Sequence, residues 1–232
     1  RNIGRGIALE LARRGSNVVI NGRRDRSLCD KVAVEAAALG VEAMVLMGDI
    51  GDAATCKQMA ATALDRFGTV DILVNNAAIR PVKAFLEMTD EDWFSVLNTD
   101  LCASFYLSRA FLPGMVAQNW GRIINFTGMN ANAGTGIHAH LSAAKHGVVG
   151  MSKALAREFG GRGITVNAIS PGKIAPDIDE RPADRIAAAI ALVPVGRLGR
   201  PQDRAARGGG GGSDEGGFIS GQMIAVNGAE ST

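Results

Sequence analysis

Hydrophobic and polar positions alternate along this 232-residue chain in a pattern that predicts strands separated by helices. Short runs rich in β-branched residues predict buried strands at 17–21, 42–47, 70–74, 122–126, 164–168 and 222–226. Apolar residues at helical spacing predict helices at 7–14, 27–39, 54–67, 141–159 and 185–192, and a longer helix from 90 to 115 with an irregular middle. Strands joined by helices of this length form right-handed crossovers and a parallel sheet covered on both faces. We therefore expect an α/β fold with a doubly wound parallel sheet, in a single domain over residues 1–232.

Two stretches interrupt this pattern. Arg1 lies within what the pattern indicates is a strand-to-helix turn, so we expect the first, central strand to be absent from this sequence. Residues 207–217 read RGGGGGSDEGG where another helix is expected. Glycine costs about 1 kcal/mol per residue in a helix, so residues 207–217 are predicted to form a loop or a poorly ordered segment within one domain.

Composition narrows the classes of function. A net charge of +2 gives no reason to expect a nucleic-acid or membrane partner, and no apolar run approaches the roughly 18 residues that cross a bilayer. Three scattered cysteines without a C-x-x-C pair indicate reduced thiols. We therefore expect a cytoplasmic protein, and the sequence predicts no metal site.

The start of the chain has features of a dinucleotide site. Residues Asn2 to Gly6 open a helix, and small residues at such a turn let main-chain N–H groups approach a pyrophosphate. A tight helix start would give the same pattern. After the next strand, Arg23 and Arg24 follow with no carboxylate before Asp25. Arginine at this position accommodates the 2′-phosphate of NADP, whereas an acidic residue favours NAD. We expect NADP rather than NAD, although both arginines could simply be solvated surface charges.

With these features in this order, the chain resembles the short-chain dehydrogenase/reductase family, and within it the 3-oxoacyl-acyl-carrier-protein reductases, over nearly its whole length. The resemblance rests on a glycine motif cut at its front, on an adenine-contacting Asp-Ile pair, on an NNAG-like segment and on a Pro-Gly pair after the sixth strand. It implies a Rossmann-type fold and cofactor contacts at Arg1, Asn2, Ile3, Gly4, Arg23, Asp49, Ile50, Asn75, Ala77, Lys145, Pro171, Gly172 and Ile174.

The same resemblance implies a catalytic tyrosine and lysine four residues apart, in which the lysine holds the nicotinamide ribose and lowers the pKa of the tyrosine. Lys145 matches the lysine, but Leu141 occupies the tyrosine position. The family's serine falls on Gly128 and its asparagine on Asp100. The threonine that follows its Pro-Gly pair falls on Pro176. Of the four catalytic positions, which are the tyrosine, lysine, serine and asparagine, the lysine alone is therefore kept.

Nearby residues could replace the missing groups. Thr127 could supply a hydroxyl, and His138 or His140 could act as an acid, because histidine titrates near neutral pH. His140 would need a changed helix start, since a shift of one residue rotates a side chain by about 100°. Asp100 could shape a water site. The plainer interpretations are that Thr127 is a buried strand-end residue, that the two histidines are polar loop residues, and that Asp100 occupies a position that has changed without a new role.

Three functions follow from these observations. The first is an NADP-dependent oxidoreductase that interconverts a carbonyl and an alcohol on a small substrate. The second is a catalytically impaired NADP-binding protein that serves as a sensor, partner subunit or relic. The third is a cofactor-independent lyase resembling halohydrin dehalogenases, which is ranked last because Lys145 stands where those enzymes have arginine. The resemblance also implies a homodimer or homotetramer through the helices around 100–115 and 141–159, and the charged loop 176–182 is predicted to be a mobile lid.

Overall fold

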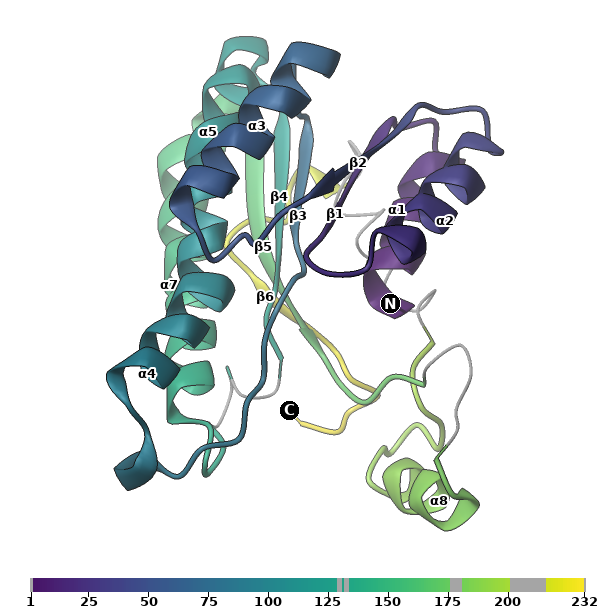
Figure 1. Cartoon of the computed structure of the whole chain (residues 1–232), viewed down its shortest axis with the longest axis vertical. Coiled ribbons are helices and arrows are strands. Elements are labelled where there is room, and N and C mark those ends of the chain that lie inside the picture. The colour runs from purple at the N-terminus through teal and green to yellow at the C-terminus, as the bar shows by residue number, and fades with distance from the viewer. Residues whose placement is uncertain (1, 129–130, 132–133, 176–180, 201–215, 232) are drawn as a thin grey trace.

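The computed structural model describes residues 2–128, 131, 134–175, 181–200 and 216–231, and it has the predicted alternation of helices and strands (Figure 1). The helices are α1 (Asn2–Arg13), α2 (Arg26–Ala37), α3 (Ala53–Phe67), α4 (Asp90–Leu97), α5 (Ala103–Gln118), α7 (Ala139–Phe159) and α8 (Ala183–Ala191). The strands are β1 (Val18–Gly22), β2 (Ala43–Met47), β3 (Ile72–Asn75), β4 (Gly121–Phe126), β5 (Ile164–Pro171) and β6 (Met223–Val226). Short 3₁₀ turns occupy Phe85–Glu87 and Gly160–Arg162.

Every described pair of strands is parallel, which confirms the predicted α/β fold class. The strands pair in two groups, β1 with β2, and β3, β4, β5 and β6 in that order. Within the part of the chain that the structure describes, no strand pairing joins β1 to β3. The register aligns Asn75 with Asn125 and Asn125 with Ala168, so the carboxyl ends of β3, β4 and β5 reach the same edge.

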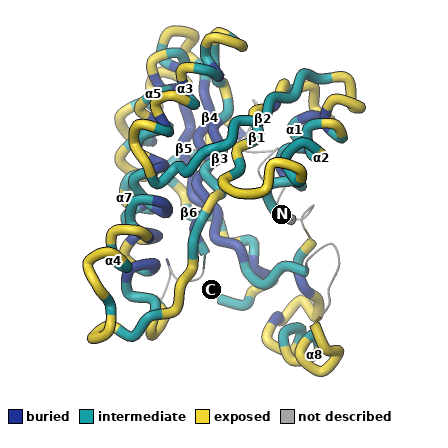
Figure 2. Tube along the Cα trace, viewed as in Figure 1, coloured by how far each residue is buried: buried dark blue, intermediate teal, exposed yellow. Residues whose placement is uncertain are grey.

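Helices cover both faces of the larger group of strands. Successive residues of a strand point to opposite faces, and β4 shows this clearly. Ile123 packs with Met115 of α5 in a cluster that α3 and α7 also reach, whereas Ile124 packs with Ile7 of α1. Figure 1 shows α3, α5 and α7 on one side, and Figure 2 shows β4 and β5 as the most deeply buried part of the chain.

The start of α1, the end of β5 and the middle of the long helix each bear on the prediction. α1 begins at Asn2, so the residues Asn2 to Gly6 that were predicted to open a helix form its first turn, ahead of the periodic stretch 7–14. β5 continues three residues beyond Ala168, since Ser170 and Pro171 pair with β6. The predicted irregular middle of the long helix is confirmed as a π-helical segment, Asn98–Cys102, between α4 and α5. π-helical turns often mark functional positions, and this one contains Asp100.

Some predictions concern residues outside the described chain. Most of 207–217 and most of the predicted lid at 176–182 lie there, as do Arg1 and Pro176. Among the residues that the structure does describe, no helix is both long and apolar enough to span a membrane.

Candidate functional site

Asn75, at the end of β3, is hydrogen-bonded to the neighbouring strand. Asn75 Nδ2 donates to Asn125 Oδ1 at 2.7 Å, and Asn125 Nδ2 donates to Ser152 Oγ at 2.8 Å. Ser152 belongs to α7, so this chain of hydrogen bonds fixes α7 against the carboxyl ends of β3 and β4. The side chain of Asn75 therefore has a structural partner of its own, while Ala77, two residues later, is exposed.

The first turn of α1 lies against the segment that follows β3. A Cβ atom on Gly4 would lie 3.2 Å from Asn76 Nδ2, which is tighter than an ordinary contact. Ile3 packs into the core beside Ile7, so its side chain points inward. The N–H groups of a first helical turn have no partner within the helix. This turn therefore offers main-chain donors beside the NNAA segment, as a dinucleotide phosphate site requires.

Arg23 and Asp49, predicted to contact the adenosine end of the cofactor, lie together. Arg23 Nη1 donates to Asp49 Oδ2 at 3.1 Å, and both side chains remain over one-third exposed. Asp49 Oδ1 accepts a hydrogen bond from the N–H of Gly51 at 2.9 Å, while the carbonyl of Ile50 accepts from Cys56. A guanidinium has five N–H donors, so Arg23 has donors left for a phosphate.

The segment after β5 closes against the last strand. Gly172 N donates to the carbonyl of Val226 at 3.2 Å, and a Cβ atom on Gly172 would lie 2.7 Å from Asn227 Cα. Ile174 forms an isolated parallel bridge with Gly199. The segment that contains Pro171, Gly172 and Ile174 thus follows the carboxyl end of β5, at the edge of the sheet where ligands of open α/β folds bind.

Lys145 occupies the interior at this edge. Its Nζ lies 3.0 Å from Asp100 Oδ1 and donates to the carbonyl of Phe126 at 3.1 Å. The side chains of Lys145 and Asp100 are 4% and 0% exposed. Burial lowers the pKa of Lys145 below its usual value, the Asp100 carboxylate opposes this shift, and the charge of Arg80 adds to it. Lys145 is therefore an ion-paired ammonium whose net pKa shift is downward.

The tyrosine position is filled by an apolar side chain. Leu141 is buried in a cluster with Val96 and Ala144, and Ile79 and Leu101 pack against it. The main-chain N–H of Ile79 also donates to Asp100 Oδ2 at 2.9 Å. The apolar cluster and the Lys145–Asp100 pair are therefore adjacent and share Ile79.

The predicted substitutes for the missing hydroxyls already have partners in the protein. Thr127 Oγ1 donates to the carbonyl of Ile169 at 3.0 Å. His140 is fully buried, and its Nδ1 accepts from the N–H of Leu141 at 2.9 Å, which assigns the ring proton to Nε2. Within the described chain, His140 Nε2 has no hydrogen-bond partner.

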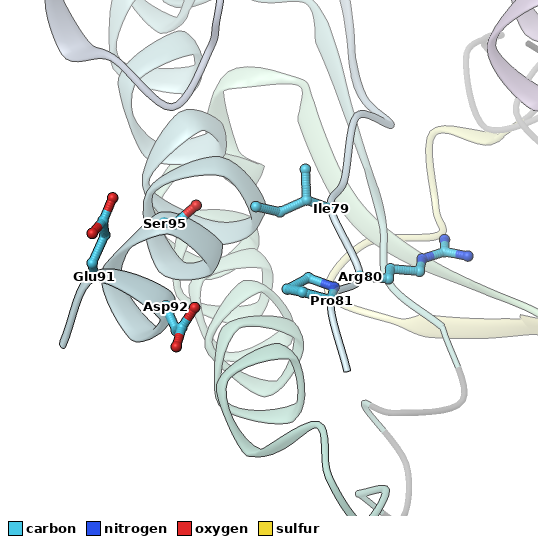
Figure 3. Close-up of a pocket in the computed structure, with 6 residues that line it drawn as sticks. All are labelled: Ile79, Arg80, Pro81, Glu91, Asp92 and Ser95. Atoms are coloured by element: carbon cyan, nitrogen blue, oxygen red, sulfur yellow. The ribbon is translucent and has the colours of Figure 1, made fainter. Parts of the chain in front are cut away.

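A surface cavity of about 430 Å³ opens beside this cluster, lined by Ile79, Arg80, Pro81, Glu91, Asp92 and Ser95. Figure 3 shows Ile79 pointing toward the helix that carries Ser95, while the exposed side chain of Arg80 points away from the other lining residues. Lys83 pairs with Asp92, one of the lining residues, at 3.3 Å. Ile79 therefore lines this cavity and also packs against the cluster that contains Leu141.

The sequence did not single out Ile79 and Arg80. The contribution of Ile79 is a main-chain N–H, which every residue but proline has, so no residue pattern could have identified it. Arg80 lies two residues beyond the NNAA segment, and a charged residue shortly after that strand end is the signal that could have identified it.

The described residues fit a nicotinamide dinucleotide. The first turn of α1 offers main-chain donors for the phosphates, the guanidinium of Arg23 is suited to the adenosine end, and the carboxyl ends of β3 to β5 share one edge, where such ligands bind. Lys145 lies at the same edge, next to the last residue of β4.

Known proteins resemble this chain over nearly its whole length. The family described as enoyl-(acyl carrier protein) reductase matches residues 1–229. The chain is 35% identical to a 3-oxoacyl-acyl-carrier-protein reductase of Staphylococcus aureus and 38% identical to one of Haemophilus influenzae, in each case over 98% of this chain and 93% of the relative. A crystal structure described as a short-chain alcohol dehydrogenase of Sinorhizobium meliloti 1021 is 27% identical, with a TM-score of 0.91 over 99% of this chain and 92% of that one.

Proposed function

The chain belongs to the short-chain dehydrogenase/reductase family of oxidoreductases, and we propose that it uses NADP to interconvert a carbonyl and an alcohol on a small substrate. The observation that carries this proposal is that Lys145 and the dinucleotide motifs meet at one edge of the sheet. Relatives named as 3-oxoacyl-acyl-carrier-protein reductases reduce a carbonyl group, which supports the same chemistry here.

The preference for NADP rests on Arg23. Its guanidinium is a cationic group at the end of β1, and its pairing with Asp49 holds it beside the residue expected to contact adenine. Planar guanidinium groups suit phosphate oxygens because they can donate two parallel hydrogen bonds. Arg24, also at this strand end, is exposed.

The residues that would hold the cofactor are those named from the family motifs, from the first turn of α1 to Ile174. When bound, the cofactor exchanges a hydride with the substrate carbon. The side chains of this protein contribute orientation, which is a large part of catalysis in such reactions, and a charged group at Lys145. Asp100 holds that group in one position.

A second candidate, an impaired NADP-binding protein, is favoured by one observation. Leu141 is buried among apolar residues and can neither donate nor accept a proton. General acid–base catalysis typically contributes about 10²–10⁴-fold to rate, so loss of the tyrosine without replacement would leave little turnover. In that case Leu141→Tyr should raise activity.

We also propose a homodimer or homotetramer in the cytoplasm. Phe94 of α4 and Phe105 of α5 are 56% and 43% exposed, which supports an interface on these helices. The three cysteines are free thiols, which supports a reducing compartment. Sedimentation of the wild type and of Phe105→Ser tests the interface. The wild type should have the mass of a dimer or tetramer and Phe105→Ser a smaller mass, and the same mass for the two proteins would contradict the interface.

Consumption of NADPH over a panel of ketones and aldehydes tests the proposed function. Wild-type protein should oxidise NADPH with at least one carbonyl compound, and Lys145→Ala should abolish that turnover. NADPH that binds without turnover for the whole panel would overturn the oxidoreductase proposal in favour of the second candidate.

A further inference from the structure

The carboxylate of Glu230 contacts Lys173 twice. Glu230 Oε1 pairs with Lys173 Nζ, and Glu230 Oε2 accepts a hydrogen bond from the main-chain N–H of Lys173 at 3.2 Å. The side chain of Glu230 is 6% exposed, whereas that of Lys173 is 32% exposed. Glu230 therefore binds both the side chain and the main chain of a residue that precedes it by 57 positions.

A tight turn after β6 carries Glu230. Ala229 has a φ of +66°, a left-handed conformation that residues other than glycine rarely adopt. The side chain of Asn227 closes this turn, because its Oδ1 accepts from the N–H of Ala229 at 3.1 Å and its Nδ2 donates to the carbonyl of Ser231 at 2.6 Å. Strained backbone persists where the surrounding contacts determine it, so the turn holds Glu230 in one position.

Lys173 lies in the segment that follows β5, at the carboxyl edge of the sheet where ligands of open α/β folds bind. Gly172 and Ile174, on either side of it, are among the residues proposed to hold the cofactor. The N–H of Gly172 donates to the carbonyl of Val226 at 3.2 Å, and a Cβ atom on Gly172 would lie 2.7 Å from Asn227 Cα. The segment 172–175 and the turn after β6 are therefore in close contact.

The chain on both sides of α8 is attached to the same two pieces. The carbonyl of Lys173 accepts from the N–H of Gly199 at 3.0 Å, and the N–H of Ala175 donates to the carbonyl of Gly199 at 2.9 Å. Val195 donates its N–H to the carbonyl of Gly228 at 3.2 Å. None of the residues of α8, all of which the structure describes, is buried, and Figure 1 shows α8 well away from the other helices.

Resting on the proposed use of NADP, we propose that Glu230 is a positioning residue for the cofactor. Its carboxylate holds the main chain of Lys173 and so keeps Gly172 and Ile174 in the conformation that contacts NADPH. The ion pair with Lys173 Nζ orients the carboxylate, and the hydrogen bond from the main-chain N–H fixes the segment. A segment that is ordered before binding loses less conformational entropy when the ligand binds.

Two substitutions of Glu230 separate this role from a loss of charge. Glu230→Ala removes both contacts and should raise the Kd of NADPH, measured by fluorescence titration, by about tenfold or more, the factor that a hydrogen bond to a charged group contributes. Glu230→Gln keeps an oxygen acceptor for the N–H of Lys173 and should stay within about threefold of the wild type. Glu158→Ala, at an exposed carboxylate of α7, should leave the Kd unchanged. A Kd in Glu230→Ala equal to that of the wild type would overturn the proposal.

A milder substitution keeps the test available if Glu230→Ala does not fold. Glu230→Asp retains the charge but places the carboxylate one methylene farther from the main chain of Lys173. We expect it to raise the Kd of NADPH by about threefold or more. A Kd in Glu230→Asp equal to that of the wild type would contradict the need for a hydrogen bond at this place.

Hydrogen exchange tests the segment without NADPH. In Glu230→Ala, the main-chain amides of 172–175 and 195–199 should exchange about tenfold faster than in the wild type, because they lose a shared anchor. The amides of β4 should exchange at the wild-type rate, and Glu230→Gln should keep most of the protection. Equal acceleration in β4 would show that Glu230 contributes only to global stability and would overturn the proposal, as would unchanged exchange throughout.

This proposal and the proposed function fail in different ways. Wild-type protein and Glu230→Ala that bind NADPH equally tightly would overturn the role of Glu230 and leave the oxidoreductase function standing. Wild-type protein that binds no NADPH would overturn both.

Discussion

Lys145 Nζ and Asp100 Oδ1 lie 3.0 Å apart in an ion pair that is almost entirely buried. Removing one partner of such a pair leaves an uncompensated charge in the interior, which typically costs about 3–5 kcal/mol. We therefore expect Asp100→Ala to lower the free energy of unfolding by about that amount, measured by urea denaturation. The change also removes the acceptor for the N–H of Ile79.

An exposed ion pair provides the control. Asp30 pairs with Arg26 on the surface of α2, and such pairs are worth under about 1 kcal/mol. Asp30→Ala should therefore have little effect. Equal losses in Asp100→Ala and Asp30→Ala would show that the buried pair does not carry the stability assigned to it.

Gly128 occupies the family's serine position with a backbone conformation that opposes serine. Its φ of +152° lies in a region that side chains rarely adopt. Such strain costs about 1–3 kcal/mol, so Gly128→Ser should destabilise the protein by that amount. Gly150→Ser, on the exposed face of α7 where a Cβ meets nothing within 4 Å, should be neutral or slightly stabilising. Thermal unfolding that is unchanged by Gly128→Ser would contradict the assigned strain.

Arg23 should determine the preference between NADP and NAD. Hydrogen bonds to charged groups contribute about 1.5–3 kcal/mol, so Arg23→Ala should weaken NADPH binding by about tenfold or more while leaving NADH binding nearly unchanged. Arg24→Ala, at the neighbouring exposed arginine, is the control and should affect both cofactors only slightly. Titration calorimetry with each cofactor measures this, and equal losses for NADPH and NADH in Arg23→Ala would refute the assignment.

The Cys56 thiol should make stability depend on alkaline pH. Burial raises the pKa of Cys56 from 9.0 to about 11, and the Asp52 and Asp49 carboxylates add to the shift. Between pH 9 and 11 the folded state keeps the thiol proton that the unfolded chain releases. The contribution of Cys56 to the free energy of unfolding is therefore complete below about pH 9 and is lost as pH rises toward 11. The loss amounts to roughly 2 kcal/mol.

Urea unfolding at pH 8 and pH 10.5 measures this loss. Between these two pH values, the free energy of unfolding of Cys56→Ala should fall by less than that of the wild type. Cys102→Ala, at a half-buried thiol, should show the same fall as the wild type. A drop of the same size in Cys56→Ala would mean that other groups cause it.

The fold could be predicted from the sequence because its strands are dense in β-branched residues and its helices have clear periodicity. Even the π-helical segment at Asn98–Cys102 was anticipated as an irregular middle. The end of β5 was not, since the extension to Pro171 depends on pairing with β6, a strand far along the chain. Local patterns carry no information about such a partner.

The candidate site was predictable only in its motifs. Lys145 and Asp100 were both identified, but their ion pair depends on the π-helical turn and on the N–H of Ile79. The hydrogen bond from Thr127 to the carbonyl of Ile169 depends on the β4–β5 register, which no residue pattern specifies. The sequence therefore identified the side chains, and tertiary contacts determine which of them can act.

The most direct test of the central claim is to follow deuterium from NADPH into the product. The protein would be incubated with NADPH deuterated at either face of nicotinamide C4 and with a carbonyl compound that supports turnover, and the alcohol would be analysed by mass spectrometry. We predict one deuterium on the former carbonyl carbon with one of the two labelled cofactors. Alcohol without deuterium from either cofactor, or no alcohol while NADPH remains bound, would contradict hydride transfer at this site.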